Sequence, residues 1–389
     1  MVALLLFAAV ITVAINLRAG LASVGPVLDD VITAYDAPAS VGGIITALPA
    51  LLFCIVGLTA VPAARRVGLT PALSGAALVM TMGLALRPFA PTITAFVVAT
   101  FAVAAGIAVG NVLGPAWIKK YAGRYMVPLT TVYSVFVCLS ASIGPLSALI
   151  TDSWQVSLGV WAIAGAIQLI VWLIVLIRVG FDTPRVVTPV DSAPELSIYR
   201  SRTAVALMLF FGLQSMNAYV QLGWLPSILG EQGVSDSVAT IGLACIGLLA
   251  ALGGLTLPTV VERFYSLTPL VLLFGTLTAA GYVGILVAPA AAPILWCCLL
   301  GLGGWCFPLS IALIPSRTRN ALTTARLAGF VQPFGSAIAA AGPLLVGVVH
   351  GIVQSYTPIL IALIVLAIIM GLLGVVASRR LYIEDELAG

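Results

Sequence analysis

The chain has 389 residues, of which 61% are hydrophobic and only 8% are charged, whereas a soluble domain carries about 25% charged residues. So much apolar surface requires the lipid bilayer as solvent, since about 20 apolar residues form a helix that crosses its hydrocarbon layer. A net charge of +4 without basic tracts, and the lack of a P-loop, dinucleotide turn or metal-ligand motif, exclude nucleic-acid binding and predict neither a cofactor nor enzymatic chemistry.

Apolar windows separated by charged or turn residues predict twelve transmembrane helices. In chain order they cover residues 3–27, 39–62, 69–89, 92–118, 125–150, 154–178, 203–229, 237–261, 267–288, 292–315, 322–349 and 354–378. Each segment is long enough to cross the bilayer. The sequence therefore predicts an all-α membrane protein, and the even number of spans places both termini on the same side.

The basic residues indicate which side this is, because cytoplasmic loops carry an excess of Lys and Arg. Fifteen of the seventeen basic residues fall on one face, and only Arg18 and Arg87 do not. The loops on the opposite face carry acidic residues instead, namely Asp29, Asp30, Asp36, Asp152, Glu231 and Asp236. We therefore expect both termini in the cytoplasm.

A polar segment divides the chain into two halves that resemble each other. Residues 179–202 are predicted to form a cytoplasmic linker between a six-helix bundle at 1–178 and another at 203–389. Several short motifs of the first half recur in the second half in the same order. They are Gly57-Leu58-Thr59 and Gly254-Leu255-Thr256, Arg66 and Arg263, Leu69-Thr70-Pro71 and Leu267-Thr268-Pro269, Gly110 with Pro115 and Gly303 with Pro308, and Gly144-Pro145 and Gly342-Pro343.

Two parallel halves related by an axis along the membrane normal are the construction of the major facilitator fold. We therefore predict two pseudo-symmetric six-helix bundles. In this fold the substrate site lies between the halves, near the bilayer midplane.

Arg18 is the most unusual residue for a membrane. It lies about fifteen residues into the first span, roughly 22 Å from its cytoplasmic end. A cation at this depth costs about 2.5 to 3.5 kcal/mol unless it faces water or a partner. We expect Arg18, with Asn16 beside it, to bind an anionic or dipolar substrate; the alternative is a structural role toward backbone carbonyls, Asp29 or Asp30.

Arg87 stands near the outer end of the third span, just before Pro88. A long side chain there can reach the membrane interface. The alternatives are snorkelling, a tie between helices, or a second basic contact on a bound anion.

The seventh span carries an unusual density of amide and aromatic side chains. Gln214, Asn217 and Gln221 are spaced so that they can share one helix face, and Trp224 follows. Polar groups in lipid must find protein or water partners, so the alternatives are contact with substrate and hydrogen bonding between helices. Further candidates of the same kind, on four other spans, are Asn111, Tyr133, Trp305 and Gln332.

Polar and Gly/Pro positions in both halves resemble the cyanate permease and nitroimidazole transporter family of the major facilitator superfamily. The matching segments are Asn16-Leu17-Arg18, Ser23 to Asp29, Thr46 to Pro49, Gly106 to Pro115, Gly212 to Ser215, Trp224 to Pro226, and Arg317 to Arg319 followed by Gly329 and Gln332. The chain departs from the pattern at Pro333 and in a reduced loop at Arg65 to Gly68, which lacks the usual Asp and opening Gly.

The resemblance implies transport of a small, often anionic or polar, organic solute by alternating access in the inner membrane of a bacterium. We expect a monomer whose partners are this solute and the lipid bilayer. The alternative is an exporter of nitroaromatic or other drug-like compounds in which aromatic residues dominate binding and Arg18 is structural. Proton coupling, exchange with a counter-anion and uniport all remain open, because the only candidate proton sites, Asp29, Asp30, Asp152 and His350, lie toward the outer surface.

Overall fold

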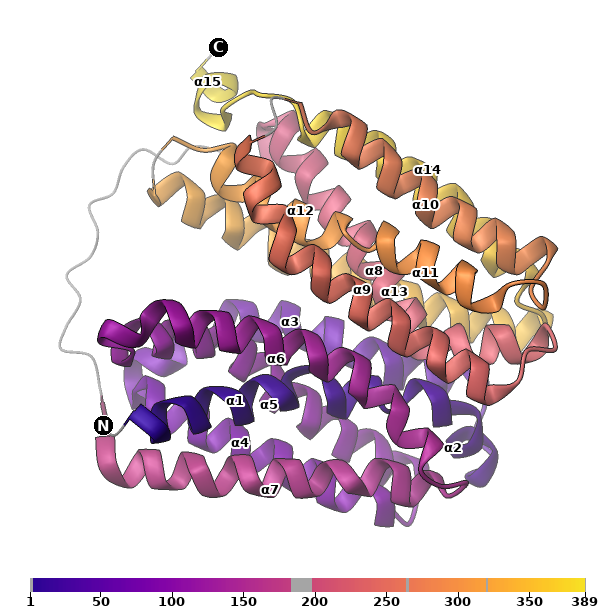
Figure 1. Cartoon of the computed structure of the whole chain (residues 1–389), viewed down its shortest axis with the longest axis horizontal. Coiled ribbons are helices and arrows are strands. Elements are labelled where there is room, and N and C mark those ends of the chain that lie inside the picture. Colours follow the sequence, from indigo (N-terminus) through magenta and orange to yellow (C-terminus); the bar gives the residue numbers. More distant parts are fainter. Residues whose placement is uncertain (1–2, 183–197, 264–265, 320, 389) are drawn as a thin grey trace.

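The computed structural model describes residues 3–182, 198–263, 266–319 and 321–388, and these are almost entirely helical (Figure 1). The first half contains seven α-helices joined by short loops and 3-10 turns. They are α1 (Ala3–Ala22), α2 (Leu28–Ala34), α3 (Ala39–Val67), α4 (Leu69–Leu86), α5 (Ile93–Tyr121), α6 (Met126–Leu146) and α7 (Trp154–Val179).

The second half contains seven long or half-length helices and a short terminal one. They are α8 (Arg202–Glu231), α9 (Asp236–Arg263), α10 (Thr268–Val287), α11 (Pro293–Gly303), α12 (Cys306–Ser316), α13 (Ala321–Val353), α14 (Thr357–Ala377) and α15 (Ile383–Ala388). Between the halves, α7 ends at Val179 and α8 begins at Arg202; most of the predicted linker, residues 183–197, lies outside the described residues.

The twelve predicted spans are confirmed, since twelve helical stretches are long and apolar enough to cross a membrane. Two of them are interrupted in ways that hydropathy did not indicate. The first continues to Ala34 through a 3-10 turn at Gly25–Val27, where Pro26 has no N–H to donate. The tenth is divided into α11 and α12 at Gly304 and Trp305.

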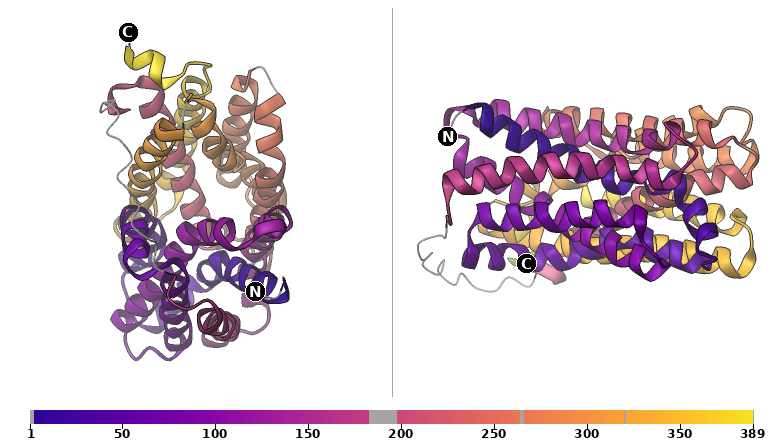
Figure 2. Two further views of the ribbon diagram at one scale, coloured as in Figure 1. Left: turned by 90° about the vertical axis from the view of Figure 1, so that its left-hand side faces the viewer. Right: turned by 90° about the horizontal axis from the view of Figure 1, so that it is seen from below.

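The helices form two bundles that lie side by side, α1 to α7 in one and α8 to α14 in the other (Figure 1). The left view of Figure 2 shows the same division, with indigo to magenta helices below and red to yellow helices above. The bundles touch where α3 packs along α13 and α6 packs along α9. They separate toward the end that carries α15, which is the end predicted to be cytoplasmic.

We call the opposite end, where the bundles meet at α2, the last turns of α8 and the start of α9, the outer end. Its contacts are close because glycines lie at them. A Cβ on Gly43 of α3 would lie 2.9 Å from the Pro343 carbonyl oxygen, and a Cβ on Gly347 would lie 2.7 Å from that of Ala39. Gly25 likewise lies directly against the carbonyl oxygen of Leu222. Only a residue without a side chain permits such approach of two backbones.

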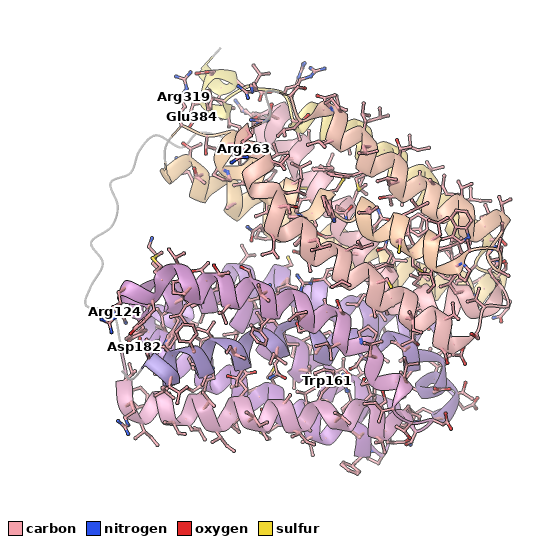
Figure 3. The ribbon with its side chains drawn as sticks, in the orientation of Figure 1. Arg124, Trp161, Asp182, Arg263, Arg319 and Glu384 are labelled. Carbon is pink, nitrogen blue, oxygen red and sulfur yellow. The ribbon has the colours of Figure 1, made fainter. Side chains whose placement is uncertain are left out.

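Charged side chains gather at the predicted cytoplasmic end of both bundles, as the labelled Asp182, Arg319 and Glu384 show (Figure 3). In the second bundle, the Arg319 guanidinium donates to Asp385 at 2.7 Å, and the Arg319 backbone N–H donates to Glu384 at 2.9 Å. These bonds hold α15 against the loop after α12.

Asp182 fastens the start of the predicted linker to the first bundle. Its carboxylate accepts hydrogen bonds from the Thr70 backbone N–H at 2.9 Å, the Tyr121 hydroxyl at 2.6 Å and the Lys120 ammonium at 2.9 Å. Burial raises the pKa of this carboxyl, but the hydrogen bonds from Tyr121, Lys120 and Thr70 outweigh burial and leave the pKa below its ordinary value. Asp182 thus caps α4, whose preceding loop lacks a carboxylate of its own.

Replacing Asp182 with asparagine keeps an acceptor for the Thr70 N–H but removes the negative charge that accepts from Lys120 and Tyr121. It is expected to destabilise the first bundle by about 1 kcal/mol at neutral pH, the usual contribution of such a bond near the surface. Because the folded-state pKa is lowered, this stabilisation is fully present above the unfolded pKa of about 3.9 and is lost as the pH falls through the lower folded value. Thermal unfolding in detergent would show this loss. The melting temperatures of the wild-type protein and of Asp182→Asn, plotted against pH, should converge below about pH 4. Asp36→Asn, at an exposed turn with φ 48°, is the control and should change nothing; equal losses in both variants would contradict the capping role.

Candidate functional site

A cavity of about 780 Å³ lies between the two bundles. It is lined by α1, α6, α8, α9 and α12, and most of the lining is apolar. The polar side chains that line it are Arg18, Gln214, Ser215, Tyr219, Gln221 and Ser316. The described residues contain no group of three His, Cys, Asp or Glu side chains placed to hold a metal ion.

Arg18 lies on α1 and lines the cavity, as predicted from its depth in the first span. Its side chain is half-buried and makes no hydrogen bond or ion pair with any residue that the structure describes. Its charge instead acts on the phenols of Tyr133 on α6 and Tyr219 on α8. Arg18 is therefore a cation without an anionic partner among the described residues, within electrostatic reach of one tyrosine from each bundle.

Gln214 on α8 is also placed as predicted. Only 3% of it is exposed, it lines the cavity, and its Oε1 has no hydrogen-bond donor in the part of the chain that is described. The neighbouring Ser215 hydroxyl is buried without a partner as well. Buried polar atoms of this kind cost free energy unless water or a ligand satisfies them, so both are available to a water or a solute in the cavity.

Gln221 and Asn217 serve mainly to join two helices. The Gln221 amide lines the cavity and donates to the Tyr282 hydroxyl of α10 at 3.0 Å; that hydroxyl in turn donates to Asn217 Oδ1 at 3.0 Å. Asn217 is fully buried and does not line the cavity. The predicted shared face therefore holds for Gln214 and Gln221, while Asn217 is turned toward α10.

The two tryptophans predicted as substrate contacts bind protein groups instead. Trp224 donates from Nε1 to the Thr46 hydroxyl of α3 at 3.1 Å, which joins the two bundles near the outer end. Trp305 donates from Nε1 to the Leu249 carbonyl of α9 at 2.8 Å. Neither lines the cavity. Each indole N–H therefore has a hydrogen-bond acceptor within the protein, as is usual for tryptophans in a protein interior.

Asn16 and Arg87 also lie away from the cavity, within the first bundle. The Asn16 amide donates to the Ala164 carbonyl of α7 at 3.1 Å, because its side chain points to the opposite side of α1 from the cavity lining. Arg87 is fully buried and donates to the Gly20 carbonyl of α1 at 3.0 Å. Arg87 thus ties two helices together and does not snorkel to the interface.

The remaining candidates, Tyr133, Asn111 and Gln332, do not line the cavity. Tyr133 and Asn111 are half-buried on α6 and α5, and Gln332 is exposed on α13. Tyr219, one of the aromatic residues of the seventh span, lines the cavity one turn from Ser215, whereas the apolar wall formed by α9 and α12 was not predicted. The spacing of Gly247, Ala251 and Gly254 by three or four residues is the signal that could have indicated the α9 face.

Comparisons with known proteins agree with this architecture. The sequence is 30% identical to the 2-nitroimidazole transporter of Escherichia coli (strain K12) over 97% of this chain and 96% of that protein. It is 25% identical to the cyanate transport protein CynX of the same strain over 89% of this chain and 90% of that protein. Among solved structures, a bacterial homologue of the human lysosomal transporter Spinster, in an inward-facing and occupied conformation, superposes with a TM-score of 0.70 at 15% identity, covering 98% of this chain and 94% of the other.

The family assignment follows from these observations together. Twelve membrane-spanning helices form two bundles around a shared cavity, and the sequence profile of the Major Facilitator Superfamily matches residues 3–343. The chain belongs to the Major Facilitator Superfamily of small-solute transporters.

Proposed function

We propose that this transporter moves a small organic anion across the membrane by alternating access, with Arg18 as the charge that binds it. The observation that carries the proposal is the half-buried guanidinium that lines an apolar cavity and has no anionic partner among the described residues. A charge in such surroundings is unfavourable unless a counter-charge or water accompanies it. A solute that brings one negative charge would neutralise it.

A second donor from the other bundle sharpens the proposal. Arg18 belongs to the first bundle, and Tyr219 of the second bundle lines the same cavity, so its hydroxyl can donate to an oxygen of the bound group. An anion held by donors from both bundles would draw them together. Binding would thereby favour the closed arrangement through which alternating access proceeds.

A second candidate function is export of neutral nitroaromatic or drug-like compounds, with Arg18 structural. It is favoured by the apolar walls of the cavity, in which Phe307, Pro308 and Ile311 of α12 lie opposite the polar side chains of α8. The name of the 2-nitroimidazole transporter is compatible with this second function. The name of the cyanate transport protein is compatible with the first function, because cyanate is an anion.

Ligand-induced thermal stabilisation of the purified protein would separate the two functions. The panel pairs small organic anions with their neutral amides, for example benzoate with benzamide, and adds cyanate and 2-nitroimidazole. A ligand at about 100 times its Kd stabilises the folded state by about 2.7 kcal/mol. We expect an anion to stabilise the wild-type protein and not Arg18→Ala. Equal stabilisation of both by a neutral compound would support the second function instead.

We further propose that a single chain is the transporting unit, because it contains both bundles and the whole cavity. The basic residues place both termini on the cytoplasmic side of a bacterial inner membrane by the positive-inside rule. Solute transport would therefore proceed between the cytoplasm and the space outside that membrane.

A further inference from the structure

A cluster of ionisable side chains joins the two bundles at the outer end, away from the cavity. The first bundle contributes Asp29 and Asp30 from α2. The second bundle contributes Glu231 at the end of α8, Asp236 at the start of α9 and His350 near the end of α13. His350 is the only histidine in the chain.

His350 is held in a defined place but lacks a full set of partners. Its ring stacks on Tyr356 with centroids 4.0 Å apart and planes 8° from parallel. Its Nδ1 lies 3.9 Å from Glu231 Oε2, which is too long for a hydrogen bond, and this nitrogen is buried without any other partner among the described residues. The other Glu231 oxygen accepts the Tyr356 backbone N–H at 3.0 Å.

The acidic side chains around His350 come from both bundles. Asp29 interacts electrostatically with His350 and also with Asp236, and Asp30 interacts with Asp236. The buried Ser227 hydroxyl of α8 faces both Asp29 and Tyr356 but makes no hydrogen bond in the described part of the chain. Closing the outer end therefore brings carboxylates of opposite bundles together.

No arginine or lysine is available to offset this repulsion nearby. The segments 28–38, 227–238 and 350–357, which supply the cluster, contain no basic residue besides His350. Histidine is the side chain that ordinarily changes charge between about pH 5 and about pH 8. Protonation of His350 is therefore the one way in which these three segments gain a positive charge under physiological conditions.

We propose that His350 is the proton-binding site of the outer end, and that its protonation stabilises the closed arrangement by bridging Glu231 of its own bundle and Asp29 of the other. The proposal rests on the alternating-access mechanism proposed above. Only the closed arrangement places Asp29 beside the imidazolium.

The direction of the effect is fixed by this geometry. In acidic medium the imidazolium offsets the repulsion between Asp29 and Asp236, so the outer end stays closed. At higher pH the imidazole is neutral, the carboxylates of the two bundles repel one another, and opening is favoured. A proton taken up from the outside would therefore bias the cycle, although the central cavity contains no carboxylate among its lining residues.

The test measures the opening of the outer end directly. Spin labels are placed on cysteines at the exposed positions 34 on α2 and 235 between α8 and α9, in a variant without the six native cysteines, reconstituted in nanodiscs. The distance between the two spin labels is measured by pulsed electron paramagnetic resonance from about pH 5 to about pH 8. We expect the fraction of molecules with a closed outer end to fall with rising pH. This fall should follow the titration curve of a single proton-binding group.

Three variants test whether His350 carries this response. His350→Gln should abolish the pH dependence and favour the open population, while His350→Lys should abolish it and favour the closed one. Asp29→Asn should reduce its amplitude. The control is Asp152→Asn, which removes an acidic side chain of the same face outside the cluster and should keep the wild-type profile. A pH response that persists unchanged in His350→Gln overturns the proposal.

The same measurement separates this proposal from the mechanism on which it rests. A wild-type distance that does not respond to pH but changes on adding a transported solute would refute the proton site and keep alternating access. A distance that responds to neither would refute both. The readout requires no knowledge of the role of Arg18, so loss of anion binding in Arg18→Ala leaves it interpretable.

Discussion

Replacing Arg18 with alanine is expected to abolish transport while the chain stays folded and inserted in the membrane. The guanidinium lines the cavity and makes no hydrogen bond or ion pair with described residues, so removing it breaks no structural contact. A bound anion would lose its charge partner in a cavity with mostly apolar walls, which costs about 2 to 5 kcal/mol. Uptake into proteoliposomes should fall at least about thirty-fold.

Arg18→Lys distinguishes charge from geometry. Lysine keeps the positive charge but cannot offer the planar pair of donors that guanidinium presents to an oxyanion, so we expect weakened transport here too. Arg178→Ala, which removes an exposed arginine at the end of α7, should transport normally. Normal uptake by Arg18→Ala would show that the substrate does not use this charge.

Placing a methyl group on Gly25 is expected to keep the outer end from closing. The new Cβ would overlap the Leu222 carbonyl oxygen of α8, a backbone atom that cannot rotate away. Overpacking of this kind costs about 1 to 3 kcal/mol. Because the overlap exists only in the closed arrangement, the cost shifts the equilibrium about five- to 150-fold toward the open arrangement. Transport by Gly25→Ala should therefore fall by a similar factor.

The distance between labels on α2 and on the loop before α9 reports this shift, because it should lengthen in Gly25→Ala at constant pH. Gly230→Ala is the matched control on α8, since a Cβ there would meet no atom within 4 Å. It should leave both the distance and the transport rate unchanged. An unaltered distance in Gly25→Ala would mean that the turn at Gly25–Val27 yields without cost.

The arrangement of spans was predictable because lipid imposes a simple requirement of length and apolarity on every crossing helix. The breaks were not, since they depend on local contacts. Gly144-Pro145 and Gly342-Pro343 are as prominent in the sequence as Gly25-Pro26, yet α13 runs through its pair without interruption. A proline alone does not decide whether a helix ends, because neighbouring helices and waters can satisfy the backbone group that it frees.

The sequence identified a site residue only where that type of residue has a single acceptable environment inside a membrane. Arg18 could be identified because an unpaired charge at that depth demands a polar cavity. Asn217 and Trp224 could not be assigned in this way, since each needs only one partner and the sequence does not say which helix supplies it. Successive residues differ by about 100° around a helix, so Gln214 reaches the cavity while Asn217, three residues on, bonds Tyr282 instead.

The glycine contacts at the outer end have an electrical consequence. Backbones approach so closely at Gly25, Gly43 and Gly347 that no side chain fits between them. In the proposed alternating-access cycle, most of the membrane voltage would therefore fall across this closed end, and the cavity would stay near the potential of the compartment to which it opens. An anion that leaves Arg18 toward that compartment crosses little voltage. In that proposed cycle, the work of about 2.3 kcal/mol per charge and 100 mV would be done when the bundles rock and the closed end changes sides. Membrane potential would then act on the rate of rocking rather than on the affinity for solute.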